Sequence, residues 1–325
     1  MKHISVNEYL KDKYGEKVYR LSLNGGMTCP NRDGKIDTRG CIFCSAGGSG
    51  DFATSPNQSI TDQIETAKSR IISKAPKCRK FIAYFQAYTN TYGDIDYLRE
   101  IFTEAITHPD IVILSIATRP DCLGSDVLEL LSDLNQIKPV WVELGLQTIH
   151  ESSAQFIRRG YKTQIYDHAV LELESRGIGV ITHLILGLPG ETNEDIYASV
   201  RHVASLAPIT SDNLPNSISN EAHALPAEKQ NVHSEIMFGI KLQLLHILKG
   251  TDLATYYEQN PFHIYDLNEY VELVANCIDL LPDNVILHRI TGDGPKSLLI
   301  EPGWSANKKL VLNTMNKYLN ERDLL

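Results

Sequence analysis

Three of the six cysteines lie close together, with eleven residues between Cys29 and Cys41 and two between Cys41 and Cys44. Thiolates are ligands for zinc and for iron–sulfur clusters, and such sites usually take four protein ligands. Three thiolates on a cube of four irons would leave one iron open to a further molecule. The spacing therefore predicts a metal centre at which chemistry can occur.

The segment that joins these cysteines has the composition of a loop. Pro30, Gly34 and Gly40 favour turns, so the chain can fold back from Cys29 to bring the third thiolate beside the C-x2-C pair. Two alternatives stay open from the residues alone. One is a zinc site completed by a distant histidine, and the other is three unrelated thiols.

The motif resembles that of radical S-adenosylmethionine (radical SAM) enzymes, and Phe43, directly before the last cysteine, fits the same motif. The resemblance implies that the three cysteines hold a [4Fe-4S] cluster whose open iron chelates the amine and carboxylate of S-adenosylmethionine. It implies reductive cleavage of that cofactor to methionine and a 5′-deoxyadenosyl radical, which abstracts hydrogen from a substrate. An electron donor such as flavodoxin or ferredoxin is then an expected partner.

The composition indicates a large soluble protein. The 325 residues are 42% hydrophobic, which is enough for a large core, and the formal net charge of −9 argues against broad binding of polyanions. No apolar run of about 18 residues and no leader-like start occurs, so we expect a cytoplasmic protein that does not enter a membrane. The isolated cysteines are expected to be small buried residues or inert thiols: Cys78, Cys122 and Cys277.

Apolar strands alternate with helical patterns along the chain, and Ser59 and Thr192 are predicted N-caps. Near-continuous apolar strands separated by helices imply an α/β fold with a parallel sheet covered by helices. Right-handed crossovers would curl it into an open (β/α)6 three-quarter barrel of the radical SAM type, and a doubly wound open sheet is the alternative. The predicted strands are 18–23, 81–85, 111–117, 140–146, 178–186 and 239–245, with one further strand at 285–290.

We expect three parts in the chain. Residues 1–17 form a polar lead-in, residues 18–281 form the partial barrel, and residues 282–325 form a C-terminal extension that closes the barrel. Residues 208–234 contain three prolines and many polar residues without periodicity, and they are predicted to be an inserted loop.

Polar residues end several predicted strands, where the loops of a barrel converge. Glu143 is the clearest of them, because a carboxylate within an apolar strand must find a partner, and the alternative to a cofactor role is an ion pair with Arg119. The resemblance implies that this strand end holds the ribose and methionine carboxylate, and that residues 186–190 contact the adenine. The predicted cofactor-binding residues are Phe43, Gln86, Arg119, Glu143, Gln147, His183 and Leu188, and Glu191 and His246 lie at other strand ends.

One segment departs from the family pattern. Many radical SAM enzymes carry Gly-Gly-Glu after the second strand to hold the methionine amine, whereas this chain has Gln86-Ala87-Tyr88-Thr89-Asn90. Gln86 or backbone carbonyls could take that role.

A wider set of motifs, in residues 28–34, 84–92, 143–147 and 289–295, resembles a bacterial subgroup related to the elongator catalytic subunit, without its acetyltransferase domain. The resemblance covers roughly residues 16 to 312 and implies that tRNA is a partner. It implies conversion of a 5-carboxymethylaminomethyl group on the wobble uridine to aminomethyl. The candidate substrate residues are Tyr88, Asn90, His288, Arg289 and Asp293.

Local basic residues and aromatic residues could serve such a tRNA interface, although solvated surface charge is the simpler interpretation. Two other functions stay open: a radical SAM enzyme that acts on a small metabolite or a protein, and a non-catalytic zinc protein. The basic and aromatic candidates are Lys77, Arg79 and Lys80; Arg158 and Arg159; Lys308 and Lys309; and Tyr88, Tyr92 and Trp304.

Overall fold

The computed structural model describes residues 3–48, 50–208, 236–292 and 294–325. All but the first residue of the predicted inserted loop, 208–234, lies outside these ranges. The candidate substrate residue Asp293 also lies outside them.

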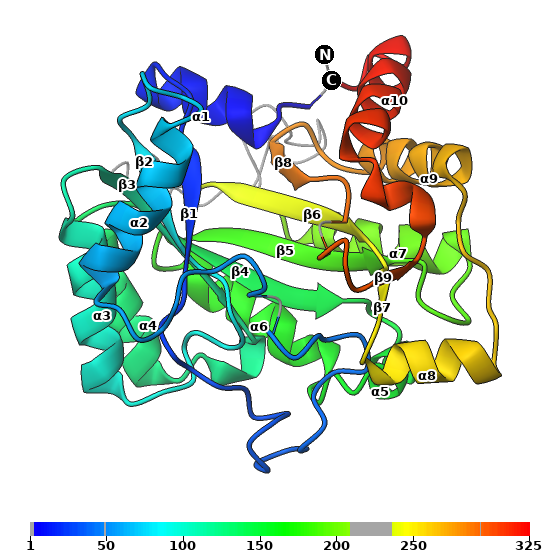
Figure 1. Cartoon of the computed structure of the whole chain (residues 1–325), viewed down its shortest axis with the longest axis horizontal. Helices are drawn as coiled ribbons and strands as arrows, with labels where there is room; N and C mark the ends of the chain where they lie inside the picture. The colour runs from blue at the N-terminus through cyan, green and yellow to red at the C-terminus, as the bar shows by residue number, and fades with distance from the viewer. Residues whose placement is uncertain (1–2, 49, 209–235, 293) are drawn as a thin grey trace, which may run out of the picture.

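Seven parallel strands form one curved sheet, and they follow one another across the sheet in chain order (Figure 1). A doubly wound sheet reverses its strand order at a switch point, so this order excludes that alternative and confirms the predicted α/β partial barrel. The further strand predicted at 285–290 joins the sheet as its seventh member, beside β6. The strands are β1 (Tyr19–Leu23), β2 (Phe81–Phe85), β3 (Ile111–Thr118), β4 (Val140–Gln147), β5 (Gly179–Leu186), β6 (Phe238–Leu244) and β8 (Val285–Arg289).

Side chains from distant strands meet inside the curve of the sheet. Arg20 on β1 and His288 on β8 stand on the two edge strands, yet their side-chain nitrogens Nη2 and Nδ1 lie 2.7 Å apart. Lys241 on β6 donates to the hydroxyl of Tyr84 on β2 at 3.4 Å. The interior of the barrel is therefore filled by side chains, and the edges are joined through them.

Helices cover the outer face of the sheet, and both predicted N-caps are present. The Ser59 hydroxyl accepts from the backbone N–H of Asp62 at 3.1 Å, and Thr192 forms a capping box with Asp195. The main helices are α2 (Ile60–Ile72), α3 (Ile95–Thr107), α4 (Ser125–Asn135), α6 (Thr163–Glu174), α7 (Asn193–Ser205), α9 (Leu267–Asp279) and α10 (Lys308–Glu321).

Shorter elements lie near the C-terminal ends of the strands. Two of them are the helices α5 (Glu151–Phe156) and α8 (Asp252–Gln259). The strands β7 (Ile247–Leu248) and β9 (Leu299–Glu301) pair in an antiparallel manner. The strand at residues 247 and 248 is not among the predicted strands, because a two-residue strand leaves no readable periodicity.

The N-terminal end of the barrel is closed by α1 (Val6–Tyr14), which begins with a capping box between Ser5 and Glu8. The chain ends lie next to each other in Figure 1, and the backbone N–H of His3 donates to the carbonyl of Leu324 at 3.3 Å. Within the described ranges, no helix has the length and apolar character needed to cross a membrane. The buried side chains that pack under the barrel are Leu10, Val18, Ile82, Ile113, Trp141, Ile181, Met237 and Ile286.

We predict that Leu10→Ala lowers the free energy of unfolding by about 2–4 kcal/mol, because Leu10 is only 2% exposed and its loss leaves a cavity under the barrel. Urea unfolding of the purified protein measures this. Lys11→Ala on the same helix is the matched control, since Lys11 is exposed and its change should stay within about 0.5 kcal/mol. Equal stability of the two variants would contradict the conclusion that α1 closes the N-terminal end of the barrel.

Candidate active site

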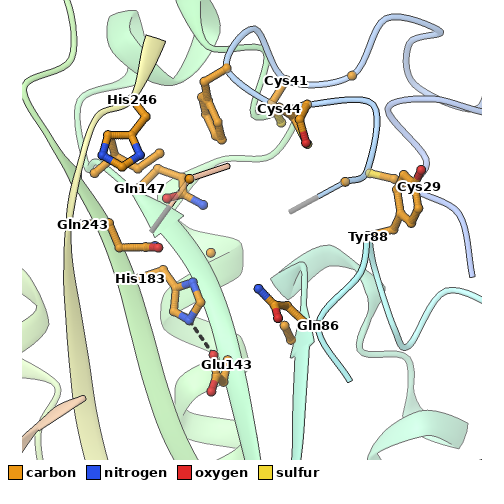
Figure 2. A pocket seen from close by; sticks show the side chains of 18 of the residues that line it. Cys29, Cys41, Cys44, Gln86, Tyr88, Glu143, Gln147, His183, Gln243 and His246 are labelled. Carbon is orange, nitrogen blue, oxygen red and sulfur yellow. Dashed lines mark hydrogen bonds and ion pairs between the residues drawn. The ribbon is translucent and has the colours of Figure 1, made fainter. Parts of the chain in front are cut away.

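A cavity of about 270 Å³ lies at the C-terminal ends of the barrel strands (Figure 2). Parallel barrels place their binding loops at this end, because the loops after the strands converge there. The three clustered cysteines and most of the predicted cofactor residues border the same space. The predicted residues that line it are Cys29, Cys41, Phe43, Cys44, Gln86, Tyr88, Arg119, Glu143, Gln147, His183, His246 and Arg289.

The C-x2-C turn is held between two segments that are far away in the sequence. The backbone N–H of Cys44 donates to the carbonyl of Cys41 at 3.0 Å and closes the turn. Ile42, between them, donates to the carbonyl of Ile157 after α5 at 3.2 Å and accepts from the N–H of Leu253 on α8 at 2.9 Å. These bonds fix the direction of both cysteines, which Figure 2 shows on one side of the cavity.

Asn31 connects the cysteine loop to the segment that follows α5. Its side-chain amide donates to the sulfur of Cys41 at 3.4 Å and to the carbonyl of Arg158 at 2.7 Å. Burial, together with the Cys44 thiol, raises the pKa of Cys41 to about 12, while the bond from Asn31 acts in the opposite direction. A thiol with such a pKa becomes a thiolate when a metal binds it, and an N–H donor to the sulfur suits that state.

Arg32 ties the cysteine loop to the residues that follow Cys44. Its guanidinium donates to the carbonyls of Cys44 at 3.2 Å and Ser45 at 2.7 Å. It lies against Gly40, where an added Cβ would come within 2.9 Å of its Nε and where φ is +78°. Glycine is thus required at position 40 both for its backbone angle and for the space.

The separation of the thiols bears on the zinc alternative. Tetrahedral zinc, with Zn–S bonds near 2.3 Å, would hold the sulfurs about 3.8 Å apart. Within the described ranges, three metal-ligating atoms lie within 4.8 Å of one another only at Glu65, His108 and Asp110, where the Lys68 ammonium already pairs with both carboxylates. The three cysteine sulfurs are therefore not all within 4.8 Å of one another, so they do not have the spacing that one tetrahedral zinc ion would impose on them.

Glu143 lies 1% exposed in the barrel interior and has a full set of donors. Ser115 donates to its Oε1 at 3.1 Å, His183 Nε2 bonds its Oε2 at 2.8 Å, and the Lys241 ammonium pairs with the same Oε2. Burial alone would raise the pKa of Glu143, but the charge of Lys241 and the bond from His183 outweigh it and hold that pKa well below its usual value. The side chain is therefore an ionised, fully bonded carboxylate.

The alternative ion pair between Glu143 and Arg119 is not formed. Arg119 bonds both carboxylate oxygens of Asp121, at 2.9 and 2.7 Å, and donates to the carbonyl of Arg159 at 2.9 Å. The partner of Glu143 is Lys241, which the sequence prediction missed. The argument that selected Glu143, a charge within an apolar strand, applies equally to Lys241 and could have found it.

Arg159 is a structural residue and does not belong to a tRNA-facing basic pair. It is 2% exposed and donates to the carbonyls of Leu146, at 3.0 Å, and Thr148, which lie on either side of Gln147 at the end of β4. Its neighbour Arg158 pairs with Asp252 at 2.7 Å. Both guanidinium groups thus serve to hold the loops around the cavity in place.

Unusual backbone angles gather around the cavity. Among the described residues other than glycine, four have positive φ, and three of these are Tyr88 at 60°, Gln147 at 68° and Arg158 at 58°. Such angles cost about 1–3 kcal/mol and persist where the surroundings impose them, often at functional sites. In Gln147 the buried side-chain oxygen has no hydrogen-bond partner in the described structure, and the residue points into the cavity in Figure 2.

Two predicted substrate residues do not line the cavity. The Asn90 amide donates to the carbonyls of Phe85 at 3.1 Å and Ala117 at 2.8 Å, so it joins the ends of β2 and β3. His288 is bonded to Arg20 deeper in the barrel and is 8% exposed. Both side chains are engaged in the scaffold.

Two predicted strand-end residues also lie outside the lining. Leu188 is 3% exposed and packs in an apolar cluster with Ile42 and Ile157, which supports the C-x2-C turn from behind. Glu191 accepts from the hydroxyl of Thr148 at 2.6 Å. Their contribution to the site is therefore through the loops that they hold.

The other basic candidates do not converge on one face. Lys77, Arg79 and Lys80 precede β2 and so lie at the N-terminal end of the barrel, away from the cavity. Lys308 and Trp304 border a small depression that Leu244, at the end of β6, also borders, so they lie on the cavity side.

Comparisons with known proteins agree with this geometry. The family model described as Radical SAM superfamily matches residues 37–203, and the Radical_SAM C-terminal domain model matches residues 237–321. The protein YtqA of Bacillus subtilis (strain 168) is 40% identical over 318 residues, which are 98% of this chain and 89% of YtqA.

A more distant similarity extends to tRNA-modifying proteins. The tRNA uridine(34) acetyltransferase of Methanocaldococcus jannaschii is 24% identical over 208 residues, which cover 64% of this chain and only 33% of that protein. The solved structure of Elp3 from Methanocaldococcus infernus, with an N-terminal deletion, has a TM-score of 0.61 at 18% identity and covers 95% of this chain and 64% of that one. The structural match supports the fold.

We predict that Glu143→Gln and Lys241→Met each lower the free energy of unfolding by about 3–5 kcal/mol, because either change leaves a buried charge without its partner. The double variant should regain most of the loss, and thermal and urea unfolding measure all three.

Arg201→Gln, which breaks the exposed pair with Glu194, is the control and should cost less than about 1 kcal/mol. A Glu143→Gln protein with normal stability but weakened cofactor binding would show that the carboxylate contacts the cofactor directly.

Proposed function

Because the chain belongs to the radical SAM superfamily, we propose that Cys29, Cys41 and Cys44 bind a [4Fe-4S] cluster and that the cavity beside them binds S-adenosylmethionine. Membership makes the protein an enzyme of this class, as the cysteine spacing predicted. The predicted relationship to the elongator catalytic subunit is likewise confirmed by the sequence similarity to the tRNA uridine(34) acetyltransferase, and the Elp3 structure shares the fold.

The observation that carries the proposal is that the three cysteines border one cavity with the polar ends of β2, β3, β4 and β5. When bound, the cluster supplies the electron for cleavage of S-adenosylmethionine to methionine and a 5′-deoxyadenosyl radical. The buried oxygen of Gln147, which has no partner in the described structure, suits a donor on the bound cofactor, such as a ribose hydroxyl. Phe43, Gln86 and Arg119 complete the proposed cofactor lining.

His183 is proposed to accept a hydrogen bond from a ligand in the cavity. Its Nε2 donates to Glu143, which leaves Nδ1 as an acceptor in the neutral ring. Burial, reinforced by the charge of Lys241, lowers the pKa of His183 to about 4, so the ring stays neutral at physiological pH. Glu143 then acts as a positioning residue that sets the tautomer and orientation of His183.

We expect that anaerobic reconstitution loads about four irons per chain, with 5′-deoxyadenosine formed on addition of a reductant. Cys29→Ala, Cys41→Ala and Cys44→Ala should each abolish 5′-deoxyadenosine formation. Iron analysis and chromatography of the nucleoside product measure these outcomes.

Cys122→Ala is the matched control for the cluster ligands, because this thiol lies outside the cavity lining and should be dispensable. Tightly bound zinc without iron uptake would refute the cluster and favour the non-catalytic zinc protein.

For the substrate, we propose a tRNA wobble uridine, modified at its 5-substituent from carboxymethylaminomethyl to aminomethyl. A relative is named for its action on uridine 34 of tRNA, although this chain spans only a third of that protein. Lys35 of the cysteine loop lies over the ring of Tyr92, with its Nζ 5.2 Å from the ring centre, and Tyr88 lines the cavity. Aromatic rings beside basic groups suit an unpaired anticodon base.

The cluster also requires an electron donor, which we propose to be a flavodoxin or a ferredoxin. The alternative function is radical chemistry on a small metabolite or a protein, which the net charge of −9 does not oppose.

We predict that deletion of the gene causes 5-carboxymethylaminomethyluridine to accumulate in total tRNA, because its removal step is lost. Nucleoside mass spectrometry of tRNA from deleted and parental cells measures this. Complementation with the intact gene should restore the profile, and complementation with Cys29→Ala should not. An unaltered profile on deletion would move the assignment to a small-molecule or protein substrate.

A further inference from the structure

The side chain of Asn31 contacts one of the proposed cluster ligands from within the protein. Its Nδ2 donates to the sulfur of Cys41 at 3.4 Å and to the carbonyl oxygen of Arg158 at 2.7 Å, and the residue is 0% exposed. An amide nitrogen of asparagine carries two hydrogens. Asn31 therefore directs one hydrogen to the sulfur and the other to the carbonyl.

The orientation of this amide follows from its neighbours. A thiolate sulfur and a carbonyl oxygen both accept hydrogen bonds, so the nitrogen of the amide, and not its oxygen, must face them. The oxygen Oδ1 of Asn31 is buried without a hydrogen-bond partner in the described structure, and a Cβ added at Gly160 would lie 3.0 Å from it. A buried oxygen without a donor destabilises the fold. The amide is therefore better explained by what its N–H groups do at the sulfur than by a gain in stability.

Bonds that do not involve the sulfur hold the Asn31 amide in place. The backbone carbonyl of Asn31 accepts from the N–H of Gly40 at 2.7 Å, and the Arg158 carbonyl accepts from its side chain. Arg158 is anchored in turn, because its guanidinium pairs with Asp252 on α8 at 2.7 Å. The direction of the N–H toward Cys41 is therefore set by the protein before a cluster binds.

The amide also lies between the Cys41 sulfur and an oxygen that would repel a thiolate. The thiol of Cys41 donates to the Arg158 carbonyl, with the sulfur and the oxygen 3.8 Å apart. A metal takes the thiolate, which has lost this hydrogen, so two acceptors would then face each other. Because Asn31 donates to both, it offsets their repulsion and places a partly positive hydrogen next to the sulfur.

We propose that Asn31 is a positioning residue that raises the reduction potential of the cluster through its hydrogen bond to the sulfur of Cys41. This deepens the proposed function, on which it rests, because it requires an iron–sulfur cluster on the three cysteines. Hydrogen bonds to the sulfurs are among the factors that set the potential of such a cluster. Reduction adds one electron from the flavodoxin or ferredoxin, and no covalent bond forms or breaks. The N–H of Asn31 binds the more negative sulfur of the reduced state more strongly, so it favours reduction.

The test measures the reduction potential of the full-length protein with reconstituted cluster, in the absence of S-adenosylmethionine. A redox titration is followed by electron paramagnetic resonance of the reduced cluster. Asn31→Leu keeps the branched shape of the side chain and removes both N–H groups. We expect its cluster to be about tenfold harder to reduce, which corresponds to a potential lower by about 59 mV for a one-electron couple. The iron content should stay at about four per chain.

Asn90→Leu is the matched control. Asn90 is also 0% exposed, its amide also donates twice, to the carbonyls of Phe85 and Ala117, and its Oδ1 is likewise buried without a partner in the part of the chain that the structure describes. The change should affect stability in a similar way and leave the potential unchanged, because neither bond goes to a cysteine sulfur. An equal shift of the potential in both variants would assign the effect to a general loosening of the fold and overturn the proposal.

A measurement on the wild type decides the question even if Asn31→Leu takes up no iron. Protein labelled with nitrogen-15 only in its asparagine side chains should show, by pulsed electron paramagnetic resonance, a coupling between the reduced cluster and a side-chain nitrogen. Asn90→Leu should keep this coupling. A wild type that holds the cluster without the coupling overturns the proposal, as does an unchanged potential in an iron-loaded Asn31→Leu protein. Uptake of zinc and no iron contradicts the proposed function instead, so the two failures are distinguishable.

Discussion

The buried ion pair between Glu143 and Lys241 is the interaction on which the barrel interior depends. Each side chain is 1% exposed, so each charge has lost its water and retains only the other and its hydrogen-bond donors. The pair joins β4 to β6 across β5, and His183 on β5 bonds to the same carboxylate oxygen. One carboxylate thus joins side chains from three neighbouring strands at the base of the cavity and orients a histidine.

At the rim of the cavity, hydrogen bonds from Arg159 hold the backbone around Gln147 in an unfavourable conformation. Gln147 adopts a left-handed backbone angle where the register between β4 and β5 shifts. Arg159 binds the carbonyls of Leu146 and Thr148, on either side of Gln147, and so fixes the backbone in this conformation. A rigid anchor beside a strained residue keeps the amide of Gln147 directed into the cavity before any ligand binds.

The sequence was sufficient to predict the fold and to bring the three cysteines to one place, but not to identify the partners of the charged residues. Apolar runs and caps such as Thr192 are local signals, and they placed the seven strands of the parallel sheet but not the short pair β7 and β9. Which charge meets Glu143 depends on the register and curvature of strands almost a hundred residues apart, so Arg119 was considered and Lys241 was not. Likewise, nothing local distinguishes Arg159, which carbonyls satisfy inside the protein, from an exposed arginine.

The chain carries a formal net charge of −9, whereas the described residues that line the cavity include the cations Lys241 and Arg289, and distance decides which charges a bound molecule experiences. Surface carboxylates that give the net charge of −9 are screened within about 10 Å at moderate salt. Lys241 and Arg289 act in a confined, poorly solvated space, where a charge is felt far more strongly than in water. The field inside the barrel is therefore set by these nearby groups, while the acidic exterior weakens indiscriminate binding of polyanions.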